Sequence, residues 1–112
     1  MSRHDSEKYL ALFARRLRDA RLRCGFTQMQ LGVLAGVDEF SASARLNQYE
    51  RGKHVPDVLM ANRLAQVLEV PLCYFYSDDD DQAQLLLLFN ALSVRKRRMV
   101  MKFAEQQVNA RT

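Results

Sequence analysis

The chain has 112 residues, of which 48% are apolar and 27% charged, with a net charge of +4. A chain of this length holds one small hydrophobic core, which leaves little room for a buried catalytic cleft and its supporting residues. No apolar run approaches the roughly 18 residues that a membrane-spanning helix needs, and the start carries no secretory signal. We therefore expect a cytoplasmic protein that is not an enzyme and has no membrane partner.

The residues that usually hold metals or form disulfides are few. Cys24 and Cys73 lie far apart and lack the CxxC spacing of a zinc or redox site, so we expect reduced cysteines that serve packing. The acidic run at residues 78–81 lacks the spaced ligands and the glycine of a calcium loop, and it is expected to cap the next helix. The sequence therefore predicts no metal and no cofactor.

The first predicted element is a helix over about residues 6–24. Its apolar stripe recurs every three or four residues, at Leu10, Phe13, Leu17 and Ala20. Positions 15–23 contain five arginines and one aspartate, which gives a local charge of five minus one, or +4. This basic patch suits a polyanionic partner, although the solvated face of an ordinary helix explains the charge equally well.

Two short helices are predicted next. Gly25 stops the first helix, and Thr27 with Gln30 forms the capping-box pattern that begins a helix over residues 28–35. Gly36 ends this helix after about two turns. A third helix starts near Asp38 or Ser41 and continues to residue 50, where another glycine follows.

The remaining elements are also helical. Asp57 caps a fourth helix, Pro71 opens a short fifth helix over residues 72–76, and an apolar helix follows over about residues 82–91. Ser93 caps a last helix that reaches about residue 108. No segment alternates polar and apolar residues in the manner of a strand, so the predicted fold is all-α.

The residues between positions 17 and 56 follow the order and spacing of a known sequence pattern. The pattern consists of Leu17, Arg18, Ala20, Arg21, Gly25, Phe26, Thr27, Gln28, Leu31, Ala35, Gly36 and Val37, followed by Tyr49, Glu50, Gly52 and Pro56. It resembles the Cro and phage-repressor type of helix-turn-helix regulator, often called the XRE family, over roughly residues 10–76. The resemblance implies a five-helix repressor-like DNA-binding domain at residues 1–77, with a two-helix C-terminal extension at residues 78–112.

The chain departs from the family pattern between Gly36 and Glu50, where it has about four additional residues. These residues, at positions 41–44, either lengthen the loop or add a turn to the third helix. Their alanines and the capping residue Asp38 favour the added turn.

The third helix is the expected reading element. Its inner stripe should be Ala42, Leu46 and Tyr49, which leaves a polar outer face. Glutamine can bond adenine through two hydrogen bonds, arginine can bond guanine, and an alanine methyl can contact thymine. The residues expected to read bases are Ser41, Ser43, Ala44, Arg45 and Gln48.

The resemblance also implies how the reading helix is held on DNA. Phosphate contacts are expected near the start of the second helix and around the end of the third, from Thr27, Gln28, Asn47, Arg51, Lys53 and His54. By resemblance, Arg21 and Glu50 form an ion pair that fixes the angle of the third helix.

The C-terminal extension has more apolar surface than two short helices can hide from each other. We expect a homodimer interface there, formed by Leu85, Leu88, Phe89, Leu92, Val100 and Phe103. The alternative is that this surface folds back on the amino-terminal domain. The predicted function is that of a sequence-specific regulator of transcription, a repressor or autoregulator, which binds double-stranded DNA as a dimer on a palindromic operator. The alternative is an antitoxin or protein-interaction module that neutralises a partner protein.

Overall fold

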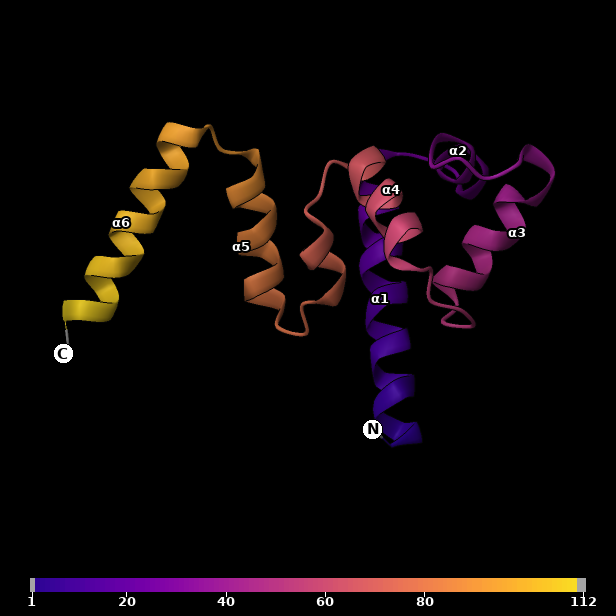
Figure 1. Ribbon diagram of the computed structural model, residues 1–112, viewed down its shortest axis with the longest axis horizontal. Helices are drawn as coiled ribbons and strands as arrows, with labels where there is room; N and C mark the ends of the chain where they lie inside the picture. The colour runs from indigo at the N-terminus through magenta and orange to yellow at the C-terminus, as the bar shows by residue number, and fades with distance from the viewer. Residues whose placement is uncertain (1, 111–112) are drawn as a thin grey trace.

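The computed structural model describes residues 2–110, and within this range it is entirely helical (Figure 1). The all-α prediction is therefore confirmed. The elements are α1 (Arg3–Cys24), α2 (Gln28–Leu34), α3 (Glu39–Glu50), α4 (Val58–Leu68), the 3-10 helix η1 (Leu72–Tyr76), α5 (Asp80–Ala91) and α6 (Val94–Ala110).

Local capping explains where the helices begin. The capping box predicted for α2 is present, since the Thr27 hydroxyl accepts from the Gln30 N–H at 3.0 Å and the Gln30 side chain accepts from the Thr27 N–H at 2.9 Å. At α3, α4 and α5 a single carboxylate accepts from a backbone N–H of the first turn, from Asp38, Asp57 and Asp79 respectively. The acidic run thus serves as the expected cap of α5.

The structure corrects the start of one predicted helix and specifies the winding of another. The first helix starts at Arg3 and not near residue 6, because the Ser2 hydroxyl accepts from the Asp5 N–H at 3.2 Å and caps an earlier turn. The short fifth helix has the predicted bounds and is a 3-10 helix, in which the Tyr74 N–H bonds the Pro71 carbonyl oxygen at 3.0 Å. A five-residue segment is short enough for this tighter winding.

The additional residues before Glu50 lengthen the third helix and leave the loop short. The Asp38 carboxylate accepts from the Phe40 N–H at 3.2 Å, so that α3 begins at Glu39 and includes residues 41–44. The alternative of a longer loop is therefore excluded. At a rise of 1.5 Å per residue, four residues extend the helix by about 6 Å.

The core lies where α1, α2, α3, α4 and η1 meet. Its largest fully buried side chains are Phe13, Phe75, Leu17, Leu31, Leu46 and Leu64. The helices α2 and α3 make the most extensive contact in the molecule. The packed stripe predicted for α1 forms part of this core, except that Leu10 is only half-buried.

Gly32 allows α2 to approach α3 closely. A Cβ atom added at this position would lie 2.8 Å from the Ala42 Cβ atom and 3.1 Å from the Ala42 Cα atom. We expect Gly32→Ala to lower the free energy of unfolding by about 1–3 kcal/mol, because the backbone of α3 would have to move. The expected loss is the net effect, after the gain of about 1 kcal/mol in helix propensity is included.

Urea unfolding measures the effect of Gly32→Ala. Val33→Ala, at the exposed neighbouring position, is the control and should change the stability little. Unchanged stability of Gly32→Ala would contradict the close approach of the two helices.

Polar contacts of Arg16 join α1 to Ser77 and to the first residue of α5. The guanidinium of Arg16, which is 5% exposed, donates to the Ser77 carbonyl oxygen at 2.8 and 3.1 Å and to the Asp80 carboxylate at 3.0 Å. Ala83 of α5 belongs to the core cluster. The core therefore continues beyond Ser77, the residue at which the domain boundary is predicted.

The helix α6 lies at the far end of the molecule from α3 (Figure 1). None of its described residues is buried. Arg97 links it to α5, donating to the Phe89 carbonyl oxygen at 3.0 Å and to the Asn90 carbonyl oxygen at 2.9 Å. Among residues 2–110, no helix is both long and apolar enough to span a membrane.

Candidate DNA-reading surface

The helix α3 has one buried face and one exposed face. Ala42, Leu46 and Tyr49 are buried against the core, as their spacing predicts. The side chains predicted to read bases are all exposed: Ser41, Ser43, Ala44, Arg45 and Gln48. The structure therefore presents these residues to solvent together, on a helix whose inner side is fixed by packing.

An ion pair fixes the C-terminal end of α3. The Arg21 Nε atom donates to Glu50 Oε2 at 2.6 Å, and its Nη2 atom donates to Glu50 Oε1 at 2.8 Å. The side chain of Glu50 is only 3% exposed and that of Arg21 11% exposed. A two-bond contact of this kind restricts both side chains to one geometry. The pair that the resemblance implies is therefore present.

The same arginine also holds the turn before α2. Its Nη1 atom donates to the Phe26 carbonyl oxygen at 2.9 Å, so one guanidinium connects α1, the turn and α3. The hydrogen bond to Glu50 raises the pKa of Arg21 above its ordinary value, although burial acts in the opposite direction. Arg21 is therefore charged at any physiological pH.

The expected phosphate ligands near the start of α2 lie next to this ion pair. The Gln28 side-chain amide donates to Glu50 Oε1 and to Asn47 Oδ1, each at 3.4 Å. The structure thus brings Gln28 beside Asn47 on α3, although the two are 19 residues apart in sequence. Their contact with phosphate stays a prediction.

Two cations and a histidine lie in the exposed connection from α3 to α4. Arg51, Lys53 and His54 are all exposed, and Gly52 takes a positive φ of 69° that turns the chain. The Lys53 N–H bonds the Gln48 carbonyl oxygen at 2.9 Å, which holds the start of this connection against the helix. These charges border the outer face of α3 at its C-terminal end.

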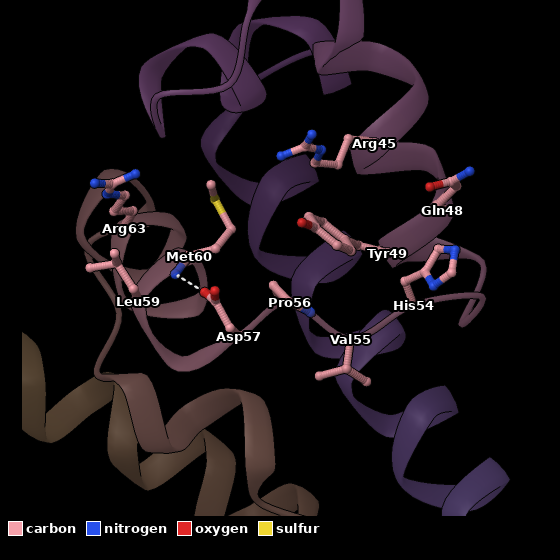
Figure 2. A pocket seen from close by; sticks show the side chains of 10 residues that line it. All are labelled: Arg45, Gln48, Tyr49, His54, Val55, Pro56, Asp57, Leu59, Met60 and Arg63. Carbon is pink, nitrogen blue, oxygen red and sulfur yellow. Dashed lines mark hydrogen bonds between the residues drawn. The ribbon is translucent and has the colours of Figure 1, made fainter.

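A groove between α3 and α4 gathers further polar groups (Figure 2). Arg45 and Gln48 line it from α3, His54 lines it from the connection, and Arg63 lines it from α4. Figure 2 shows Gln48 and His54 at one end of this groove and Arg63 at the other. Three basic side chains therefore border a single hollow beside the reading helix.

Sequence reasoning missed two exposed residues in this region. Arg63 follows Arg45 by eighteen positions, and only the packing of α4 beside α3 brings it into the groove. Phe40 is 95% exposed in the first turn of α3. Its spacing of four residues from Ala44 was a signal that could have placed it on the outer face.

A short helix, a turn and an exposed second helix held by an internal ion pair define a helix-turn-helix protein. The chain belongs to the helix-turn-helix domain family, whose sequence model matches residues 12–73. The crystal structure of the transcriptional regulator BswR is similar to this structure, with 44% sequence identity and a TM-score of 0.83. No curated protein matches the sequence.

The likeness to BswR extends beyond the DNA-binding domain. It covers 88% of this chain and 98% of the chain of BswR. Because 88% of 112 residues is more than residues 1–77 contain, the match includes part of the C-terminal extension. The extension is therefore shared, at least in part, with that regulator.

Proposed function

We propose that this protein is a sequence-specific regulator of transcription that binds double-stranded DNA through α3. The observation that carries the proposal is the exposed polar face of α3, bordered by cations and fixed in angle by the Arg21–Glu50 pair. A rigid helix with such a face fits the major groove, where base edges are distinguishable. The family membership and the likeness to a transcriptional regulator support this proposal.

In this proposal, base contacts and phosphate contacts come from different residues. Gln48 and Arg45 offer hydrogen bonds to base edges, with Ser41, Ser43 and Ala44 on the same exposed side of α3. The phosphates that flank the major groove of the DNA are bound by Thr27, Gln28, Asn47, Arg51, Lys53 and His54. Arg63 is added to these phosphate ligands, because it lines the groove between α3 and α4 together with Arg45 and His54.

We further propose that two copies bind a palindromic operator as a homodimer. The apolar residues predicted for the interface leave a large surface in one copy, since Leu85 is 53%, Leu88 54% and Phe103 63% exposed. Phe89, Leu92 and Val100 are half-buried. Exposed apolar surface on two successive helices favours an interface between subunits. A dimer occupying its operator would act as a repressor or autoregulator by excluding other proteins from that site.

Selection of bound sequences from random duplex DNA tests the proposed function. We expect an enriched palindrome whose half-sites are about one helical turn apart, and binding that weakens steeply as salt increases. Enrichment of no sequence would contradict the proposal. In that case the alternative of a module that neutralises a partner protein would account for the apolar extension.

Gln48→Ala separates base reading from general attraction to DNA. We expect it to weaken binding to the selected operator by about 1–3 kcal/mol, with little change on unrelated DNA, because a base contact is lost. Fluorescence anisotropy titrations on both duplexes measure the difference. Equal weakening on both would remove Gln48 from the base-reading residues.

Lys53→Ala is the matched comparison for Gln48→Ala. It should weaken binding to both duplexes alike and lower the magnitude of the salt slope by about one, as expected for a lost phosphate contact.

A further inference from the structure

Phe40 is the most exposed large apolar side chain in the described part of the molecule. It is 95% exposed, and the core of this region is filled instead by Val37, Ala42 and Leu46. A phenylalanine ring is among the largest apolar groups that a contact can remove from water. Its position on the outside of α3 therefore provides unused binding surface.

The ring lies on the face that is proposed to read DNA. Phe40, Ala44 and Gln48 follow each other at intervals of four residues, which places them along one side of the helix. The Phe40 N–H donates to the Asp38 carboxylate at 3.2 Å, and this cap fixes the first turn. Phe40 therefore continues the proposed reading face to its N-terminal end.

The charges around α3 indicate which part of DNA this end would meet. Asp38 and Glu39 are acidic, so the first turn is unfavourable next to phosphates. The cations Arg51 and Lys53 lie at the opposite end of the helix, where a phosphate contact is favourable. The cations favour phosphate contact at the C-terminal end of α3, and recognition helices place their N-terminal residues on base edges in the major groove, so we expect the turn that carries Phe40 to meet the bases.

We propose that Phe40 is a specificity-determining residue that selects thymine, by packing its ring against the C5-methyl group in the major groove. The thymine methyl is the one apolar group that the base pairs present there, and phenylalanine is among the side chains that contact it. The added turn of α3 supplies the reach, about 6 Å beyond a helix without it. The assignment rests on the proposed function, since it requires that α3 binds DNA.

The test uses the full chain and the operator obtained by selection from random duplex DNA. Each thymine of a half-site is replaced in turn by uracil, which keeps the base pairing and removes only the methyl group. At one thymine we expect about fourfold weaker binding of the unmodified protein, which corresponds to the burial of about one carbon atom. Replacement in both half-sites should weaken binding about 15-fold, if the two contacts are independent.

Phe40→Ala provides the second arm of the experiment. The variant should bind the thymine operator at least as weakly as the unmodified protein binds the uracil operator, and it should no longer distinguish the two duplexes. Phe40→Leu should retain part of the discrimination. The thermal midpoint of Phe40→Ala should not fall, because the ring makes almost no contact within the protein. Leu22→Ala, which shortens an exposed apolar residue of α1, should leave both affinities unchanged.

Three results would overturn the assignment, and they point to different errors. If the unmodified protein selects no sequence, the proposed function fails and the role of Phe40 fails with it. If it selects an operator whose thymines are all insensitive to loss of the methyl group, only the assignment of Phe40 fails. If Phe40→Ala keeps both the affinity and the sensitivity to uracil, another residue contacts the thymine methyl group. The Phe40 ring would then be available to bind a protein.

Discussion

Replacement of Arg21 by alanine is expected to lower the free energy of unfolding by about 3 kcal/mol, which is a large fraction of the stability of so small a domain. The variant would leave the Glu50 carboxylate, 3% exposed in the intact pair, without its two strongest donors. The Phe26 carbonyl would lose its donor as well. Only the 3.4 Å contact from Gln28 would remain at Glu50. Chemical unfolding followed by circular dichroism measures the loss.

The same variant should also bind the operator more weakly, although Arg21 is not among the proposed DNA ligands. The guanidinium fixes where α3 ends relative to α1, so its loss changes the angle of the reading face. A loss of specific affinity at a temperature where the variant is still folded would separate this effect from unfolding.

Two further variants control the Arg21 experiment. Arg21→Lys keeps the charge and loses the planar two-bond contact, so it should be intermediate in stability. The double variant Arg21→Ala with Glu50→Ala leaves no charge buried, and it should be more stable than Arg21→Ala alone. A double variant as unstable as the sum of the single changes would show that the two residues do not act as a pair.

A charge placed on the apolar surface of the extension should separate the proposed dimer. Leu88→Glu and Phe103→Glu alter residues that are 54% and 63% exposed in a single copy, so each monomer should fold normally. We expect the mass in solution to fall to 13.0 kDa, that of one chain. Specific affinity should fall by about 100-fold or more, because the second reading helix no longer binds as part of the same complex.

Light scattering and operator titration together measure the effect of these two substitutions. Gln106→Glu adds the same charge to a polar, exposed position of α6, and it should leave both mass and affinity unchanged. Variants that stay dimeric with full affinity would place the interface outside the extension. An unmodified protein that is already monomeric would contradict the dimer itself.

The sequence predicted most of the fold because the helix boundaries are local. Each boundary depends on one or two residues, as in the Thr27–Gln30 capping box and the Asp38 cap of α3. The apolar spacing of α3 was enough to predict its buried side, Ala42, Leu46 and Tyr49. The winding of η1 was not predictable in this way, because 3-10 and α-helical turns have the same capping residues.

The candidate site could be predicted only where its residues share one helix or match the family pattern. The face of α3 follows from periodicity, and the Arg21–Glu50 pair followed from the resemblance. The place of Arg63 beside Arg45 depends on how α4 packs against α3, which no local pattern gives. The hydrogen bond from Arg16 to the Ser77 carbonyl oxygen could not be predicted for the same reason, since it joins residues 61 positions apart.

The capping of the helices also bears on how the chain folds. Within residues 2–110, each of the six α-helices begins after a capping residue whose side chain accepts a hydrogen bond from a backbone N–H of the first turn. These residues are Ser2, Thr27, Asp38, Asp57, Asp79 and Ser93. Such contacts close within three residues, so helical turns can form before distant parts of the chain meet. Helices as short as α2 are marginal in isolation and gain most of their stability when they pack around Phe13 and Leu46. Because most contacts of a helical chain are local, such chains fold within microseconds to milliseconds.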